Sequence, residues 1–250
     1  MNLKTGTMLA DDIIKELILS QTANGIDISS GIDSIEYCKD PSRYRNYNKL
    51  VMYQYNYMGY RDDEWPDNLL NNIWSVGDSF TVGLGQPLEE TWPRLVSKKL
   101  NQRVINVSMN GASNDWIARR VRFILKHFAP KIMLIQWSYL HRREDTNTDL
   151  LDEFRAIWHA TKHVSDDLEN FLGNLKSIES AKGSTQVVHS FIPEFYSLKT
   201  QDDQTIYQTM RDINALGFPP CKQVDYSRDG HHYDVETATC YAEKYYEQIK

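Results

Sequence analysis

A serine, an aspartate and a histidine occupy positions from which they could carry out acyl transfer together. Ser79 lies in Gly77-Asp78-Ser79-Phe80-Thr81, directly after a short apolar stretch, in the kind of turn that presents a nucleophile. Asp229 and His232 are three residues apart near the other end of the chain, so one turn can present both. A serine hydroxyl needs a base to remove its proton, and that base is usually a histidine oriented by a carboxylate. These spacings indicate a Ser-His-Asp arrangement.

The fold must bring these distant residues together, and the hydrophobic pattern predicts one that does. We expect strands over residues 73–76, 104–107, 132–137, 186–192 and 222–226, and helices over 89–100, 115–128, 149–181 (as one or two) and 235–249. Strands that alternate with helices indicate a parallel sheet covered on both faces. We therefore predict a three-layer α/β/α sandwich with a flavodoxin-like parallel sheet of about five strands. Ligands of such sheets lie at the carboxyl ends of the strands, which is where Ser79 and the loop before the last helix would meet.

The first 55 residues are predicted to be a peripheral N-terminal extension, and residues 56–250 to be the main domain. An amphipathic stretch over residues 11–19 precedes a polar loop. Tyr53, Tyr55 and Tyr57 alternate with period two, which predicts a strand with one aromatic face. Packing of this strand on the main body is favoured over an aromatic platform for a ligand.

The composition excludes several classes of protein. The 250 residues are 41% hydrophobic with a net charge of −6, which indicates a globular chain and disfavours binding to nucleic acid. No apolar run reaches the ~20 residues that span a bilayer, so we expect no membrane segment. Charged residues interrupt the first twenty positions, so an intracellular protein without a secretory signal is expected. Three cysteines, an odd number, fit reduced thiols.

No metal or organic cofactor is expected. His159 and His163 have the spacing of two metal ligands on a helix, but no HExxH motif accompanies them and a solvated helix face is favoured. Residues 83–85 read Gly-Leu-Gly, without the third glycine of a dinucleotide loop or the Gly-Lys-Ser/Thr ending of a phosphate loop.

Three blocks of sequence resemble the SGNH (GDSL-type) serine hydrolases. Residues 76–80 (VGDSF), 106–113 (NVSMNGAS) and 229–232 (DGHH) resemble the first, second and fifth family blocks, and the likeness covers about residues 57–249. The resemblance implies that Ser79 is the nucleophile, His232 the base and Asp229 its orienting partner. It also implies an oxyanion hole that includes the backbone N–H groups of Ser79 and Gly111. Glycine suits that place because a side chain would crowd an oxyanion about 3 Å away.

The family's third block corresponds here to residues 136–142 (QWSYLHR), and this segment departs from the family pattern. Where the family has an asparagine that donates to the oxyanion, an ungapped count places Leu140, and leucine cannot donate. Either a neighbour substitutes, or the hole keeps two backbone donors, and losing one donor typically costs about 10²–10³ in rate. The possible substitutes are Ser138, Tyr139, His141 and Arg142. Candidates for contacts with substrate or oxyanion are Asn110, Asn114, Ser138 and Tyr139, although turn formation explains the two asparagines equally well.

Two further side chains have competing interpretations. Asp78 is expected to stabilise its own turn rather than to act as an acid. His231 could replace His232 as base, but the spacing from Asp229 favours His232.

The function expected from these residues and the resemblance is hydrolysis of a short-chain acyl ester, such as an acetyl group on a carbohydrate. The partner is then a small-molecule or carbohydrate ester, and the sequence defines no oligomeric state. Three alternatives stay open: a glycan O-acyltransferase with the same triad, a binding module that keeps the fold without activity, and a metal-dependent hydrolase built on the histidines.

Overall fold

A four-stranded parallel sheet forms the centre of the protein. The computed structural model describes residues 17, 26–28, 51–144, 156–158, 164–193 and 216–250. The strand order is β4-β3-β5-β8. These strands comprise β4 (Val104–Asn106), β3 (Ile73–Val76), β5 (Ile132–Trp137) and β8 (Gln186–Phe191). Ile73 pairs with both Val104 and Ile132, so the strands begin in register.

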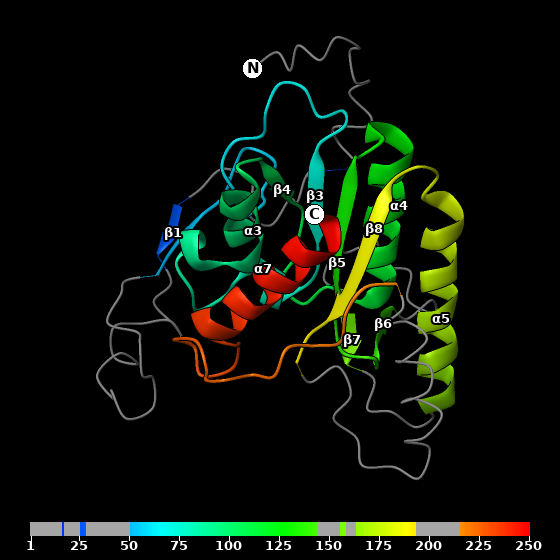
Figure 1. The fold of residues 1–250 in the computed structure, drawn as a ribbon. Coiled ribbons are helices and arrows are strands. Elements are labelled where there is room, and N and C mark those ends of the chain that lie inside the picture. Colours follow the sequence, from blue (N-terminus) through cyan, green and yellow to red (C-terminus); the bar gives the residue numbers. More distant parts are fainter. Residues whose placement is uncertain (1–16, 18–25, 29–50, 145–155, 159–163, 194–215) are drawn as a thin grey trace.

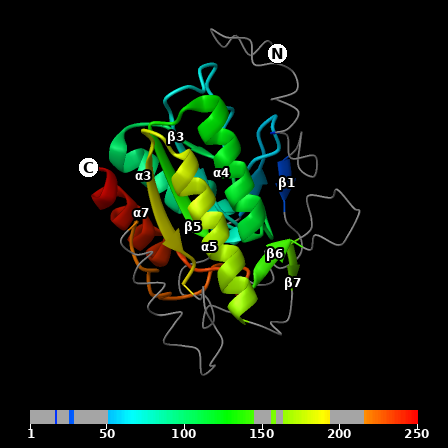
Figure 2. The same cartoon turned by 90° about the vertical axis from the view of Figure 1, so that its right-hand side faces the viewer.

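Two pairs of helices cover the faces of the sheet (Figures 1 and 2). On one face α3 (Trp92–Leu100) contacts α7 (Val235–Ile249), and on the other α4 (Asn114–Phe128) contacts α5 (Val164–Ala181). The predicted three-layer α/β/α fold is confirmed. Observed bounds agree with the expected ones to within one residue for all four strands and for the helices at 114–128 and 235–249.

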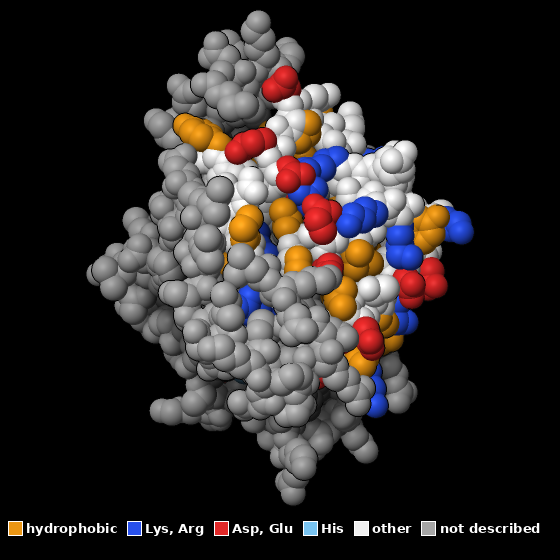
Figure 3. Space-filling model, turned by 90° about the vertical axis from the view of Figure 1, so that its left-hand side faces the viewer, with side chains coloured by type: hydrophobic (Ala, Val, Ile, Leu, Met, Phe, Trp, Pro, Cys, Tyr) orange, Lys and Arg blue, Asp and Glu red, His pale blue; other side chains and the backbone are white. Residues whose placement is uncertain are grey.

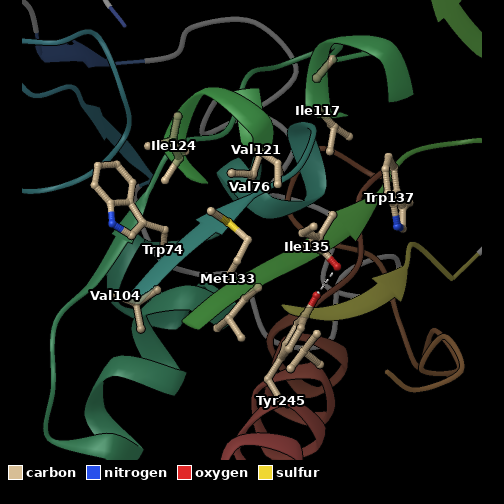
Figure 4. Close-up of a cluster of buried hydrophobic side chains, with 14 of the residues drawn as sticks. Trp74, Val76, Val104, Ile117, Val121, Ile124, Met133, Ile135, Trp137 and Tyr245 are labelled. Atoms are coloured by element: carbon tan, nitrogen blue, oxygen red, sulfur yellow. Dashed lines mark hydrogen bonds between the residues drawn. The ribbon is translucent and has the colours of Figure 1, made fainter. Parts of the chain in front are cut away.

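Apolar side chains fill the space between sheet and helices. One face packs on α4, and Figure 4 shows the side chains concerned: Trp74, Val76, Met133, Ile117, Val121 and Ile124, all buried. On the opposite face the hydroxyl of Tyr245 in α7 donates to the carbonyl of Ile135 at 2.7 Å, so a polar contact also fixes α7 to β5. Residues of β5 are buried on both sides, as expected for the inner strand of a covered parallel sheet.

The strand predicted over residues 222–226 is not present. The chain instead makes one parallel bridge, His189 to Gly217, beside β8, and one antiparallel bridge, Tyr226 to Tyr233. Gly217 lies so close to the strand that a Cβ would be 1.8 Å from the carbonyl oxygen of His189. Residues 219 and 220 are both proline, which have no N–H to continue a ladder. The edge position therefore holds a single bridge in place of a fifth strand.

The helical prediction for residues 149–181 is wrong at residues 156–158 and confirmed over 164–181, and the rest of that range lies outside the described residues. Residues Ala156–Trp158 form β7, which pairs antiparallel with β6 (Arg142–Glu144), and α5 begins at Val164. Because β6 consists of charged residues, no apolar alternation marks it in the sequence. Its side chains pair across the fold instead, with 3.2 Å between Arg143 Nε and Asp167 Oδ1.

The helix predicted over residues 89–100 begins at residue 92, three residues after the predicted start. A single 3₁₀ turn, η2 (Leu88–Glu90), comes first, and α3 follows from Trp92 with Pro93 in its first turn, a position that proline favours.

The segment before β3 contacts the main body. Strand β2 (Met52–Gln54) pairs with β1 (Ile26–Ile28), so the expected strand ends at Gln54, with Tyr53 buried and Tyr57 exposed. The Tyr53 hydroxyl accepts a 2.8 Å hydrogen bond from the N–H of Gly85. Of the amphipathic stretch 11–19 only Leu17 is described, and it is buried in the core. The division at residue 55 stays a prediction.

Three general expectations can be compared with the described residues. Among them, Cys221 and Cys240 are free thiols, and Cys38 lies outside the described part. Within the same residues, no helix has both the length and the apolar character needed to cross a bilayer. Acidic and basic side chains are interspersed over the described part of the face in Figure 3, with no single basic surface there.

Candidate active site

The turn after β3 presents Ser79 at the carboxyl edge of the sheet. Ser79 begins the short helix α2 (Ser79–Val82), and its side chain is almost fully buried. Asp78 caps this turn, since its Oδ1 accepts from the N–H of Phe80 at 3.0 Å, which confirms the structural role expected for it. A Cβ on Gly77 would lie 2.1 Å from Thr81 Oγ1, so only glycine lets the turn close this tightly.

The loop before α7 holds a paired carboxylate and imidazole. Asp229 Oδ2 and His232 Nδ1 share a short hydrogen bond. The other carboxylate oxygen accepts from the backbone N–H groups of His231 and His232, each at 2.9 Å, and from Ser227 Oγ at 2.7 Å. Burial alone would raise the pKa of Asp229, but the bonds from His232 and Ser227 outweigh it and lower that pKa to about 2. The carboxylate is thus ionised at neutral pH and orients the ring.

The His232 ring adjoins the residue that follows the serine. Its centroid is 4.6 Å from that of the Phe80 ring, in an edge-on arrangement. Its second nitrogen, Nε2, is buried and has no hydrogen-bond partner among the described residues. His231, by contrast, is exposed, and its backbone N–H donates to Asp229 Oδ1. Of the two candidate bases, His232 is therefore the one whose ring is oriented by the carboxylate.

The loop after β4 lies beside the nucleophile turn. The ladder between β3 and β4 continues beyond the strands, with the N–H of Met109 donating to the carbonyl of Gly77 at 3.2 Å. Gly111 has φ of +76°, a left-handed conformation that suits glycine, and a Cβ there would meet no atom within 4 Å. Within the described part of the chain, the N–H groups of Ser79 and Gly111 have no hydrogen-bond acceptor. Both are available as donors.

The third block forms a buried polar network that the sequence did not reveal. Ser138 Oγ donates to Asp78 Oδ2 at 2.6 Å, and Arg142 Nη1 lies 3.4 Å from the same oxygen. Leu140, at the place of the family asparagine, is buried. Ser138 and Arg142 are 60 and 64 positions from Asp78, so no local pattern signals the network. Through Asp78, the network stabilises the turn that carries Ser79.

Three of the four predicted contact residues, Asn114, Ser138 and Tyr139, have structural partners of their own. The side-chain amide of Asn114 accepts from the N–H of Ser138 and donates to the carbonyl of Tyr139, each at 3.0 Å. Asn110 is exposed in its loop. The Tyr139 ring lies 6.2 Å from that of Phe80 and stacks on His141, 5.6 Å between centroids. Burial, and then the charge of Arg142, lower the pKa of His141. A role for Asn110, Asn114, Ser138 or Tyr139 toward substrate stays a prediction.

No group of three potential metal ligands occurs among the described residues. His159 and His163, which have metal-ligand spacing, lie outside them.

Comparisons with known proteins give likenesses of structure only. No family model matches the sequence, and no curated protein matches it. Among solved structures, the chain is similar to a lipolytic protein of the G-D-S-L family from Desulfitobacterium hafniense, with 15% identity, coverage of 72% of this chain and 99% of the other, and a TM-score of 0.48. It is similar to the esterase EstA from Pseudoalteromonas sp. (16%, 72% and 96%, 0.46) and to a family two carbohydrate esterase from Clostridium thermocellum (15%, 72% and 64%, 0.47). These proteins are of the class that the three sequence blocks resemble. The likeness is one of fold, so the chemistry rests on the residues of this chain.

Proposed function

We propose that the protein is a serine esterase that hydrolyses a short-chain acyl ester. The observation that carries this proposal is the His232 ring, bonded through Nδ1 to an ionised Asp229 while Nε2 is buried, unpartnered in the described structure and beside the turn of Ser79. A neutral imidazole held in that tautomer can accept a proton at Nε2, as a general base for a serine must.

The reaction proceeds through a covalent acyl-enzyme. Ser79 Oγ attacks the ester carbonyl as His232 takes its proton, and the protonated ring then gives that proton to the departing alcohol. Water, deprotonated by the same ring, attacks the acyl-enzyme and releases the acid and free Ser79. The Asp229 carboxylate stabilises the imidazolium in both steps.

Two backbone groups hold the oxyanion. The N–H groups of Ser79 and Gly111 come from neighbouring strand ends and are both free to donate within the described structure. Because Leu140 supplies no third donor, we expect a slower enzyme than one with a complete hole, by about 10²–10³ in rate.

The substrate is an ester with a small acyl group, for which an acetylated carbohydrate is the leading candidate. This follows from the family that the sequence blocks resemble. Reaction with a sugar hydroxyl in place of water would make the same residues an O-acyltransferase. The ratio of acylated sugar to free acetate, measured with an acetyl donor and a glycan acceptor, distinguishes the two.

A series of p-nitrophenyl esters from acetate to octanoate tests the proposal. The acetate should be hydrolysed fastest, and Ser79→Ala should abolish turnover. Ser108→Ala is the matched control, because Ser108 is also a buried serine at a strand end but donates to Asn106 Oδ1 at 2.7 Å. A Ser79→Ala protein that retains wild-type turnover, or a wild-type protein without turnover, would contradict the proposal.

A second candidate, a binding module without catalysis, is favoured by one observation. Leu140 is a buried apolar residue where the family supplies an oxyanion donor. Binding of acetylated oligosaccharides that is equal in wild type and Ser79→Ala, with no acetate released, would favour this second function.

A further inference from the structure

The residues after the proposed nucleophile and after the proposed base are joined by one buried side chain. Tyr233 follows His232, and its hydroxyl donates to the carbonyl of Phe80, which follows Ser79, at 3.1 Å. The two are 153 positions apart in the sequence. The Tyr233 and Phe80 rings also lie 5.2 Å apart, so the contact is both polar and apolar.

The same hydroxyl is anchored to the central sheet. Its single proton is shared between the Phe80 carbonyl and Oε1 of Gln136 in β5, which lies 3.2 Å away. The same Gln136 oxygen accepts from Thr81 Oγ1 of α2 at 2.9 Å and from Trp92 Nε1 of α3 at 3.1 Å. An indole N–H can only donate, so Trp92 fixes the carbonyl side of the amide toward this point. Gln136 is fully buried. A single oxygen on the sheet thus holds both the helix of the nucleophile and the loop of the base.

Tyr233 is fixed at its backbone as well. The side-chain amide of Gln86, from the loop after α2, donates to the Tyr233 carbonyl. Burial raises the pKa of the Tyr233 hydroxyl well above its usual range, so the group stays protonated and remains a donor. Within residues 216–234, the described segment before α7, the only regular pairing consists of the bridges at Gly217 and Tyr226. The contacts of Tyr233 therefore supply rigidity that a helix or strand would otherwise provide.

We propose that Tyr233 is a positioning residue, whose hydroxyl fixes the separation between Ser79 and His232. The inference rests on the proposed function, because it concerns the geometry of that triad. Loss of the hydroxyl would leave Ser79 and His232 chemically unchanged. It would let the turns that carry them move relative to each other. A displacement of about 1 Å in such a pair can cost on the order of 10²-fold in rate.

Tyr233→Phe tests this proposal, with Tyr241→Phe as its matched control. Tyr241 stacks on Tyr233 at 5.3 Å, is equally buried, and donates through its hydroxyl to a carbonyl as well, that of Phe191 at 2.6 Å. Each change removes one buried hydrogen bond, so both should lower the Tm by similar amounts. Only Tyr233→Phe should lower kcat for p-nitrophenyl acetate, by about 10- to 100-fold with KM nearly unchanged.

A second variant decides the question if Tyr233→Phe does not fold. Thr81→Val removes the hydroxyl that links α2 to the same Gln136 oxygen, and it should also lower kcat more than KM. Folded variants whose kcat equals that of Tyr241→Phe would overturn the positioning role while leaving the esterase proposal intact. A wild-type protein with no Ser79-dependent turnover would overturn the esterase proposal, and the inference with it.

Discussion

Replacing Asp229 by asparagine changes how the imidazole of His232 is held while preserving the loop around it. Oδ1 of Asp229 accepts three hydrogen bonds, from two backbone N–H groups and from Ser227 Oγ. An asparagine oxygen can accept all three, so the turn keeps its shape. The amide NH₂ then takes the place of Oδ2, facing His232 Nδ1.

The consequence for catalysis follows from the direction of that one bond. An NH₂ group donates, so Nδ1 must become the acceptor and the ring proton moves to Nε2. A ring that carries its proton on Nε2 cannot accept the proton of Ser79. We therefore expect Asp229→Asn to lower kcat/KM for p-nitrophenyl acetate by about 10⁴-fold, the scale of a wrong tautomer in a triad.

Stability provides an independent measure of the same interaction. The pKa of Asp229 is lowered from 3.8 to about 2, so its stabilising effect is present above pH 3.8 and is lost as the pH falls toward 2. The difference corresponds to about 2 kcal/mol in the free energy of unfolding. Wild type should lose that amount over this interval in urea titrations, and Asp229→Asn should not.

The control is Asp234→Asn, five residues further on. Asp234 Oδ1 caps α7 by accepting from the N–H of Thr237 at 3.0 Å, a role that asparagine performs equally well. This variant should retain activity. An Asp229→Asn enzyme with activity within tenfold of wild type would refute the reasoning about the tautomer.

Three further outcomes are expected. Gly111→Ala should lower kcat, because the methyl group of the alanine would enter the open space beside the proposed oxyanion donor. Gly183→Ala is the control, since Gly183 also has a positive φ, +54°, and open space around it. It should lower the free energy of unfolding by a similar amount without loss of rate. Gly77→Ala should destabilise the protein by about 1–3 kcal/mol in thermal or urea unfolding, because its Cβ would lie 2.1 Å from a threonine hydroxyl. The hydrogen bond with His189 is the main cause that lowers the pKa of Glu179 from 4.5 to about 2, so Glu179→Gln should show a smaller loss of stability than wild type as the pH falls through that interval.

The sequence predicted the elements whose signals are local. Strand β5 has the bounds expected from the apolar run over residues 132–135 and the Gln-Trp pair that follows it. Helix α7 begins after Asp234, which caps it. The predicted turn around Asp78 was also local, since its carboxylate bonds to a residue two positions away.

Long-range pairing explains what the sequence did not predict. The hairpin of β6 and β7 joins a charged strand to residues 156–158, and no local periodicity marks it. The contacts of Ser138 with Asp78 and of Tyr233 with Phe80 span 60 and 153 positions. Such contacts depend on how the layers pack, and their residues are ordinary ones in the sequence. The sequence blocks that resemble the SGNH family identified the residues of the candidate triad. The side chains that support those residues were identified only from the structure.

Covalent labelling with a fluorophosphonate tests most directly whether Ser79 is an activated nucleophile. The reagent should add one phosphonyl group per chain, and peptide mapping by mass spectrometry should locate it on Ser79. Labelling should be lost in Ser79→Ala and strongly slowed in His232→Ala, but not in His231→Ala. A wild-type chain that stays unlabelled, or one labelled at another residue, would contradict the account.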